Sequence, residues 1–195
     1  MTENLCHLAQ HIIESASKSG ATAADCVIRE GNELSATVRS GEVEQLKEAG
    51  AKSLGLRVFI GQRSAGAYTS DFSRSGVERL VSSALSAARV TSEDPCAGLP
   101  DADVSGQLEG DLQLFCDDVT HLQAATAIDI ARRAEQAAFA FDPRIRNSEG
   151  GSVEAGYGRK ILANSHGFLG EYSRSSCSLS VVPIAAPDGS AMSQG

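Results

Sequence analysis

The stretch KSLGLRVFIGQRSAGAYTS, residues 52–70, decides the fold class. Two runs of strand-forming residues flank the dipeptide Gly61-Gln62, a connection that is typical of a tight hairpin. A chain that reverses within two residues pairs its strands antiparallel, because a parallel crossover needs a dozen or more residues. The stretch therefore predicts an antiparallel sheet.

Other segments extend this sheet on both sides of the hairpin. DCVIRE and ELSATVRS flank Gly31-Asn32 and predict a second two-residue hairpin, and VEQLKE is a weaker candidate strand. Near the far end of the chain, Leu179, Val181 and Pro183 alternate with other residues, which predicts a strand, and proline favours a sheet edge. A turn is expected at residues 187–189, Pro-Asp-Gly.

Three helices are expected beside the sheet. Residues 3–18 carry an apolar face, and Gly20 stops that helix. Ser75 and Glu78 form a capping box that opens a second helix. Thr120, with Gln123, caps a third helix that runs to about Phe141 and ends at Asp142-Pro143; its many alanines would let another element approach closely. The order of elements predicts an α+β fold, mostly antiparallel, as a single domain over residues 1–195.

The charge balance is acidic and localised. Seventeen basic and 25 acidic residues give −8, and eight acids lie in residues 92–118, which hold no Lys or Arg. This segment is typical of a solvated connection. A cation-binding loop is the alternative, although the acids lack the alternating spacing and central glycine of a calcium loop. An acidic chain also argues against nucleic-acid binding, which depends on Lys and Arg at phosphates.

The cysteines and the N-terminus point to a reduced, cytoplasmic protein. The five cysteines stand at positions 6, 26, 96, 116 and 177, an odd number with no close pair. This spacing argues against a disulfide framework, a zinc ribbon and a CxxC redox site. The first 20 residues are neither a signal peptide nor a membrane span, so no membrane partner is expected.

A glycine-rich stretch, RNSEGGSVEAGYGRKILANSHG at residues 146–167, raises the possibility of a phosphate-binding loop. The Walker pattern fails because Tyr157 stands where Lys must follow Gly156, and the dinucleotide pattern fails at Ile161. Both patterns also need a helix directly afterwards, whereas RKILANSHG is typical of a strand and a turn. We interpret the glycines as hairpin turns that need positive φ.

The other candidates for chemistry are weak, and we predict no catalytic, cofactor-binding or metal-binding residue in this chain. His7 and His11 stand one helical turn apart, but Leu8 replaces the glutamate of a zinc peptidase and both lie opposite the apolar face. His121 falls in a cap and His166 in a turn. Cys96 has no cationic neighbour in the sequence and is interpreted as structural.

Several ordered segments resemble a known family. SLGLRVFIGQRSAGAYTSDFS, SEDPCAGLPD and then RAEQAA…DPRIRNSEGGSV…YGRKILANSHG are similar to the N-terminal half of PmbA-like (TldE-like) members of the TldD/PmbA family, once described as modulators of DNA gyrase. The resemblance covers essentially all 195 residues. It implies that family chains continue into a second, β-rich domain that is absent from this sequence.

The resemblance also implies a function. The family forms cytoplasmic assemblies of two related subunits, a zinc-dependent peptidase for small or unfolded peptides, whose metal site is an H-E-x-x-x-H helix in the C-terminal region of the TldD-like subunit. This chain has no His followed by Glu. We therefore expect a non-catalytic subunit domain, with zinc in a TldD-like partner and an exposed sheet edge within residues 146–184 that holds peptide.

Two other functions stay open. One is a regulatory or binding protein that assembles with a second copy of itself, has no peptidase activity of its own and contacts DNA gyrase only indirectly. The other is a nucleotide-binding enzyme, which the failed glycine motifs disfavour. A co-purified partner with H-E-x-x-x-H would separate the first of these from the peptidase subunit.

Overall fold

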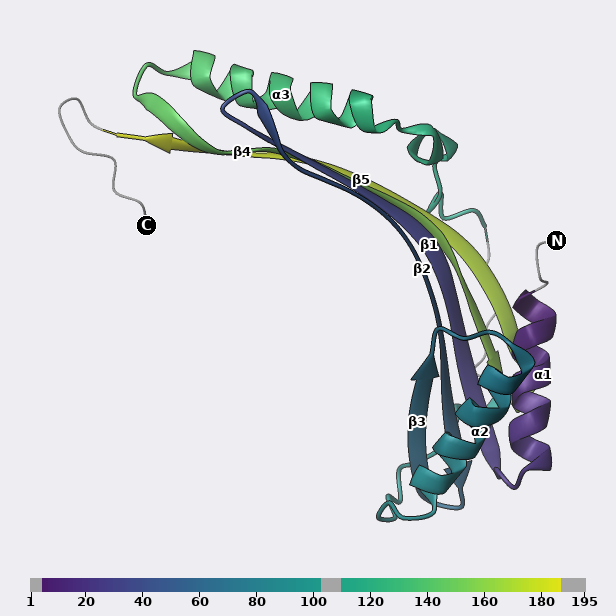
Figure 1. Cartoon of the computed structure of the whole chain (residues 1–195). Coiled ribbons are helices and arrows are strands. Elements are labelled where there is room, and N and C mark those ends of the chain that lie inside the picture. Colours follow the sequence, from purple (N-terminus) through teal and green to yellow (C-terminus); the bar gives the residue numbers. More distant parts are fainter. Residues whose placement is uncertain (1–4, 103–109, 187–195) are drawn as a thin grey trace. The chain divides into compact units, whose positions relative to one another are not determined.

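The computed structural model describes residues 5–102 and 110–186 (Figure 1). The expected turn at residues 187–189 lies outside them. The predicted α+β class with an antiparallel sheet is confirmed. The elements, in chain order, are α1 (Leu5–Lys18), β1 (Ala23–Arg39), β2 (Glu42–Ile60), β3 (Arg63–Thr69), α2 (Arg74–Ala88), the 3-10 helix η2 (Asp117–His121), α3 (Ala124–Phe141), β4 (Ile145–Asn164) and β5 (Leu169–Ala185).

Five strands form one sheet in the order β3-β2-β1-β4-β5. The hairpin predicted at Gly61-Gln62 is confirmed: Ile60 faces Arg63, and Gly61 adopts a φ of 59°. Sequential neighbours β1–β2, β2–β3 and β4–β5 are joined by tight connections, so most of the pairing is local.

The hairpin predicted at Gly31-Asn32 is wrong. Strand β1 runs through both residues without a break, and the chain reverses instead at Ser40-Gly41, where φ is 52° and 80°. Both of these residues adopt the positive φ that a two-residue hairpin turn needs, whereas Gly31 does not. The segment VEQLKE is confirmed as strand and is continuous with KSLGLRVFI in β2.

The chain divides into two compact units. Unit 1 holds the described residues within Met1–Glu30, Ala51–Leu112 and Gly158–Ser173, and unit 2 holds those within Gly31–Gly50, Gln113–Tyr157 and Arg174–Gly195. Strands β1, β2, β4 and β5 each contribute one segment to either unit. That the whole chain folds as a single domain stays a prediction.

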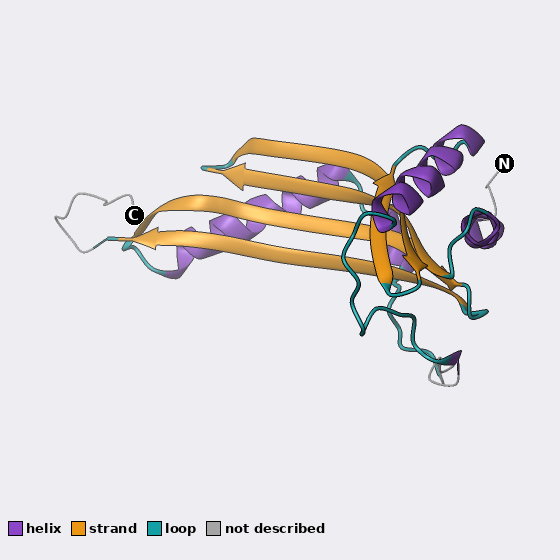
Figure 2. Cartoon of the chain, turned by 90° about the horizontal axis from the view of Figure 1, so that it is seen from below, coloured by secondary structure: helices purple, strands orange, loops and turns teal. Residues whose placement is uncertain are grey.

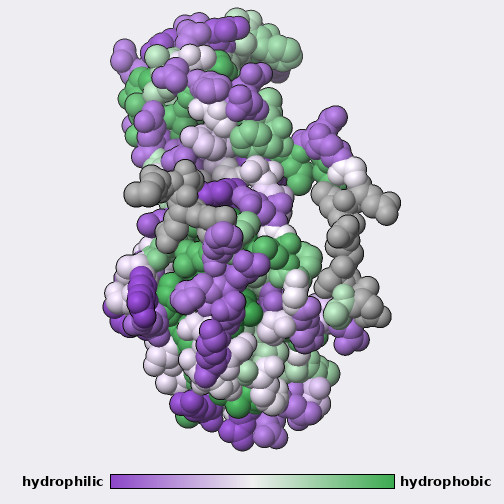
Figure 3. All heavy atoms as spheres, turned by 90° about the vertical axis from the view of Figure 1, so that its right-hand side faces the viewer, coloured by the Kyte–Doolittle hydropathy of each residue, from purple (hydrophilic) through white to green (hydrophobic). Residues whose placement is uncertain are grey.

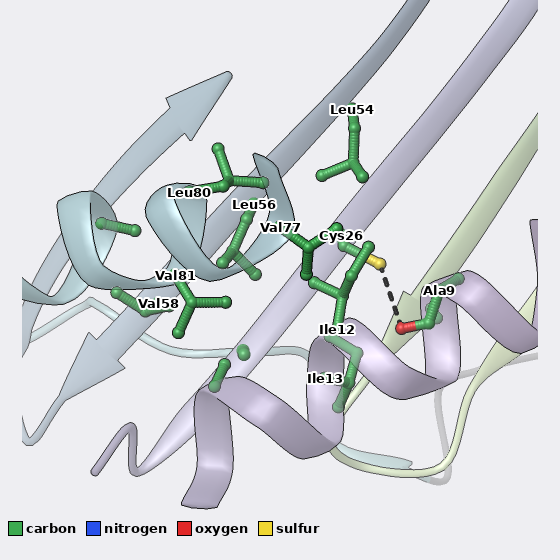
Figure 4. Packing of buried hydrophobic residues seen from close by; sticks show 14 of the residues in the cluster. Ala9, Ile12, Ile13, Cys26, Leu54, Leu56, Val58, Val77, Leu80 and Val81 are labelled. Carbon is green, nitrogen blue, oxygen red and sulfur yellow. Dashed lines mark hydrogen bonds between the residues drawn. The ribbon is translucent and has the colours of Figure 1, made fainter. Parts of the chain in front are cut away.

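The core of unit 1 lies between its part of the sheet and the helices α1 and α2. Figure 4 shows Ile12 of α1 and Val77 of α2 close to Cys26, and Val81 of α2 close to Val58. Ile13, Leu54 and Leu80 belong to the same buried cluster. The Cys26 thiol is fully buried in this cluster and donates to the carbonyl oxygen of Ala9 at 3.6 Å. Burial raises the pKa of Cys26 to about 12, so this thiol is unreactive.

The N-terminus of α2 differs from the capping box that the sequence predicts. The N-cap is Ser73, whose hydroxyl accepts a hydrogen bond from the backbone N–H of Gly76 at 3.1 Å. Ser75 lies inside the helix, and Glu78 pairs with Arg74 at 3.1 Å. The cap is displaced because the helix begins two residues earlier than the S-x-x-E pattern indicates.

Helix α3 covers the core of unit 2. It begins at Ala124, not at Thr120, which lies in η2; its N-cap Gln123 makes no side-chain capping bond, so the predicted Thr120–Gln123 cap is wrong. The helix ends at Phe141, before Asp142-Pro143, as predicted. Six fully or nearly buried residues form this core: Leu34, Ala36, Val38, Ala127, Ala131 and Val153.

The surface is mixed, without one large apolar area on the face that Figure 3 presents. There, hydrophobic residues form small separate patches surrounded by hydrophilic ones. Within residues 5–102 and 110–186, no helix is both long and apolar enough to cross a membrane.

Candidate functional site

The outer edge of β5 is exposed in unit 2. Strand β5 ends the strand order, and its residues Arg174–Ala185 are exposed or half-exposed along their whole length. Helix α3 lies over β1 and β4, as its contacts show, and leaves β5 uncovered. From Ser175 to Ala185 the strand carries no charged side chain.

A short segment of the chain already lies against this edge. The backbone N–H of Ser175 donates to the carbonyl oxygen of Leu114 at 2.9 Å. The backbone N–H of Cys116 donates in turn to the hydroxyl of Ser175 at 2.7 Å. We call residues Leu114–Cys116 the strap. Leu114 and Phe115 are exposed beside the strand, so the strap adds apolar surface to the edge.

The face of the unit 2 sheet that lies opposite α3 is polar. Figure 2 shows α3 behind the strands, with the nearer face bare of helices. A shallow groove of about 480 Å³ on unit 2 is lined by Glu33 and Lys47 from the β1–β2 hairpin, Glu154 from β4, and Ser176 and Ser178 from β5. The groove adjoins the inner side of the β5 edge, and its lining combines these polar side chains with Leu34, Ala155 and Cys177.

A buried carboxylate fixes the strands that carry this edge. Glu135 of α3 is only 1% exposed. Its carboxylate accepts hydrogen bonds from the backbone N–H groups of Ser40 and Gly41, both at 2.9 Å, and from the hydroxyl of Ser148 at 2.7 Å. That hydroxyl accepts from the N–H of Gly150 at 2.7 Å. The helix is thereby joined to the β1–β2 turn and to β4.

The electrostatics of this carboxylate follow from its partners. Burial by itself raises the pKa of Glu135, but the hydrogen bonds from Ser148, Gly41 and Ser40 and the nearby Arg39 outweigh it, so the pKa is lowered. Glu135 is therefore ionised at neutral pH. Arg39 donates to the carbonyl of Ser148 and Arg132 to that of Gly41, each at 3.1 Å, so β1 is also joined to β4, and α3 to the β1–β2 turn.

The glycine-rich stretch is mostly strand, which corrects the prediction of hairpin turns. Strand β4 runs from Ile145 to Asn164, and Gly151, Gly156 and Gly158 lie inside it. Only Gly150 and Gly167 have positive φ, 109° and 91°. Gly151 serves another purpose, because a side chain there would meet the carbonyl of Ala131 in α3 at 2.3 Å. This confirms the prediction that another element approaches the alanine-rich helix closely.

The histidines considered from the sequence do not converge. His7 and His11 lie on the exposed side of α1. His121 is exposed in η2 near Asp117, and the ring Nδ1 of His166 lies 2.9 Å from the carbonyl of Pro100. Across residues 5–102 and 110–186, no three His, Cys, Asp or Glu side chains are grouped so that they could hold a metal ion.

Other segments singled out in the sequence are exposed connections. Cys96 is exposed, and its N–H donates to the Asp94 carboxylate at 2.9 Å in a local turn. Within the acidic connection, residues 103–109 lie outside the described part of the chain. The acids that are described, among them Asp94, Asp117 and Asp118, are exposed, as a solvated connection requires.

Sequence reasoning missed Glu135 and the strap. The signal for Glu135 was present: it follows Ala127 and Ala131 at intervals of four residues and therefore shares their buried face. A glutamate on that face requires hydrogen-bond donors. The strap had no sequence signal, because a single pair of bonds between Ser175 and a distant loop leaves no periodic pattern.

Comparison with known proteins gives consistent results. Two sequence profiles of one family match the chain: the PmbA/TldA metallopeptidase domain 1 over residues 24–88, and the PmbA/TldA metallopeptidase central domain over residues 117–195. Together these matches cover most of the chain.

Two curated relatives are similar in sequence. The metalloprotease PmbA of Escherichia coli O157:H7 is 39% identical over 166 residues, which is 85% of this chain and 36% of the relative. A metalloprotease PmbA homolog of Haemophilus influenzae is 38% identical over 172 residues, 87% of this chain and 38% of the relative. The chain thus spans less than two-fifths of the length of either relative.

Solved structures share the fold. A candidate modulator of DNA gyrase from Bacteroides thetaiotaomicron matches with a TM-score of 0.87 at 24% identity, covering 98% of this chain and 43% of that one. TldE from Thermococcus kodakarensis matches with a TM-score of 0.81 at 13% identity, covering 94% of this chain and 40% of that one. At these identities the likeness shows the fold.

Proposed function

Because this chain belongs to the PmbA/TldA metallopeptidase family, we propose that it is a non-catalytic subunit domain of a two-subunit, zinc-dependent peptidase that processes small or unfolded peptides. Its role is to hold an extended segment of the substrate peptide while a TldD-like partner cleaves it. The relatives named metalloprotease PmbA support the peptidase part of this proposal.

The observation that carries the proposal is the outer edge of β5. An extended peptide adds to such an edge through main-chain hydrogen bonds, so binding does not depend on one particular side chain. This property suits a protein that handles unfolded peptides of varied sequence. The uncharged composition of Ser175–Ala185 further favours pairing, because charges are the usual protection of an edge strand.

Zinc belongs to the partner in this proposal. A catalytic zinc site takes three protein ligands and keeps one open position. The described residues do not fit that requirement, because His7 and His11 are exposed on α1 with no third ligand grouped beside them. No step of the reaction is therefore assigned to a residue of this chain.

The proposal is tested by adding the chain to a TldD-like subunit that carries H-E-x-x-x-H. We expect a complex of the two proteins by light scattering, and a changed rate of cleavage of carboxymethylated, unfolded α-lactalbumin. A complex whose cleavage rate equals that of the partner alone, at saturating concentrations of this chain, would contradict the proposal.

A second candidate function is a regulatory protein that assembles with itself. The same uncharged edge favours it, because the β5 strands of two copies can pair across a two-fold axis. Two solved relatives are named as candidate modulators of a DNA gyrase. With a net charge of −8, such a role would act through protein contact and not through DNA. A stable homodimer with no effect on the partner's cleavage would favour this candidate.

We further propose a cytoplasmic location. None of the five cysteines is in a disulfide, as expected in a reducing compartment. A thiol titration of protein isolated under non-reducing conditions tests this: five free thiols are expected after denaturation.

A further inference from the structure

The directions of the backbone N–H groups along β5 follow from the hydrogen bonds that Ser175 and Ala186 make near its two ends. The N–H of Ser175 donates to Leu114 of the strap and therefore points away from β4. The N–H of Ala186 donates to the carbonyl of Arg144, directly before β4, and therefore points toward it. Successive N–H groups of a strand alternate in direction. Odd-numbered residues between these ends thus direct their N–H groups outward.

Pro183 agrees independently with this assignment. Pro183 is an odd-numbered residue, so its backbone nitrogen faces away from β4. A nitrogen in that direction makes no hydrogen bond to β4, and the missing N–H of proline therefore costs the sheet nothing. A proline that faced β4 would remove a bond from the ladder. Proline has no N–H, so the outward series of donors ends before it. Three outward N–H groups remain between the strap and Pro183: those of Cys177, Leu179 and Val181.

The other edge of the unit 2 sheet is protected by contrast. Strand β3 pairs with β2 only over Leu54–Ile60, so the β2 segment from Glu42 to Gly50 is also an edge within the described residues. That segment carries three glutamates and one lysine in nine residues. Charges of this kind block the addition of a further strand. Among the described residues of unit 2, the β5 edge, which has no charged side chain from Ser175 to Ala185, is the one open to pairing.

The strap shows that this edge accepts a second backbone. Leu114 takes the position of an added strand at Ser175, and the bond from Cys116 to the Ser175 hydroxyl fixes it there. An incoming strand would continue from the strap along Cys177 to Val181. Exposed Leu114 and Phe115 would lie near one end of that strand and Pro183 at the other.

We propose that the β5 edge between the strap and Pro183 is a peptide-binding site for a short, extended, uncharged segment. The peptide's carbonyl oxygens accept hydrogen bonds from Cys177, Leu179 and Val181. This inference rests on the proposed function and specifies where that function holds its substrate and which substrates fit. Segments that are helical, or rich in proline, lack the extended backbone that the site pairs with.

A substitution pair tests the site in the whole chain. Leu179→Pro removes one outward N–H and leaves the bonds to β4, whereas Leu179→Ala removes the side chain and leaves that N–H. The probe is a fluorescein-labelled ten-residue peptide of Ser, Thr and Val, followed by fluorescence anisotropy. We expect Leu179→Pro to weaken binding about tenfold and Leu179→Ala to change it less than about threefold.

Two peptides with equal numbers of N-methyl groups test the mode of binding with the unaltered protein. Methylation of three alternate residues leaves one edge of the peptide able to pair, whereas methylation of three consecutive residues blocks both edges. We expect the first peptide to bind like the parent and the second to bind about tenfold more weakly. Equal binding of the two methylated peptides would overturn the proposal, even if Leu179→Pro misfolds.

Protection of a cysteine thiol from alkylation tests where the peptide binds. Cys177 and Cys96 are both exposed, but only Cys177 lies on the proposed site. Saturating peptide should slow alkylation of Cys177 several-fold and leave Cys96 unchanged. If this chain alters the partner's cleavage but Cys177 is not protected, the proposed function stands and the site is wrong. If the chain neither binds the peptide nor alters cleavage, both are wrong.

Discussion

Glu135 is the residue on which the arrangement of unit 2 depends most directly. One carboxylate accepts three hydrogen bonds, two of them from the turn between β1 and β2 and one from Ser148 of β4. Hydrogen bonds to a buried ionised group are stronger than neutral ones. Loss of one of them leaves an N–H of the turn or the hydroxyl of Ser148 without this partner.

Replacing Glu135 by glutamine tests this role. The amide group cannot accept bonds at both of its ends, so at least one N–H of Ser40 or Gly41 loses its partner. We expect Glu135→Gln to lower the free energy of unfolding by about 2 kcal/mol at neutral pH, measured by urea denaturation. Glu149→Gln is the matched control, because Glu149 is exposed in the same unit. Equal effects of the two changes would contradict the role.

The same residue predicts a pH dependence. The pKa of Glu135 is lower in the folded protein than its unfolded value, about 4.3. A lowered folded pKa contributes stability above the unfolded pKa, and this is lost as the pH falls through the folded value. The difference in stability between wild type and Glu135→Gln should therefore be largest at neutral pH and shrink below about pH 4. A difference that does not change with pH would refute the assignment.

Helix α2 offers a direct test of which serine is the cap. The structure assigns this function to Ser73, whereas the sequence pattern favours Ser75. We expect Ser73→Ala to lower the free energy of unfolding by about 1 kcal/mol, and Ser75→Ala by less than about 0.5 kcal/mol, in thermal or urea unfolding. A larger loss of stability for Ser75→Ala than for Ser73→Ala would instead support the capping box that the sequence predicts.

The packing of α3 on β4 depends on Gly151. An added methyl group would lie 2.3 Å from the backbone oxygen of Ala131, which cannot move without moving the helix. We expect Gly151→Ala to cost about 2–4 kcal/mol of unfolding free energy. Gly156→Ala is the control in the same strand, since its nearest neighbour lies at an ordinary 3.5 Å. Similar costs for both would show that the helix does not approach so closely.

The sequence predicted which segments are helices and which are strands, but not how long the strands are. The spacing of apolar residues and the residues typical of turns predicted the helices, the Gly61-Gln62 hairpin and the strand that contains Pro183. The long strands were divided wrongly, because β1, β2 and β4 have 17, 19 and 20 residues, whereas strands usually have 3–10. Glycines inside them resemble turns locally, and only long-range packing, as at Gly151, explains their presence.

The candidate site was predictable only in part. Alternation around Pro183 indicated an edge strand within residues 146–184, and β5 is such a strand. The direction of its N–H groups depends on bonds to Leu114 and Arg144, which are distant in sequence. No pattern local to β5 records those contacts, so the strap and the open donors required the structure.

The chain as a whole is predicted to unfold in one step. Four strands run covalently through both compact units, so melting of one unit removes strand structure that continues into the other. We expect Ser73→Ala in unit 1 and Glu135→Gln in unit 2 to lower the midpoint of one shared transition, followed by circular dichroism and by native-state hydrogen exchange. Two transitions, each sensitive to one substitution, would show two separate domains.

We propose that this chain supports a peptidase without catalysing cleavage itself. The most direct test of this proposal is to measure zinc content and unfolded-peptide cleavage for the chain alone and for its mixture with a TldD-like subunit. We expect no bound zinc and no cleavage for the chain alone, and altered cleavage in the mixture. Zinc bound one-to-one, with cleavage by the chain alone, would contradict it and return attention to His7 and His11.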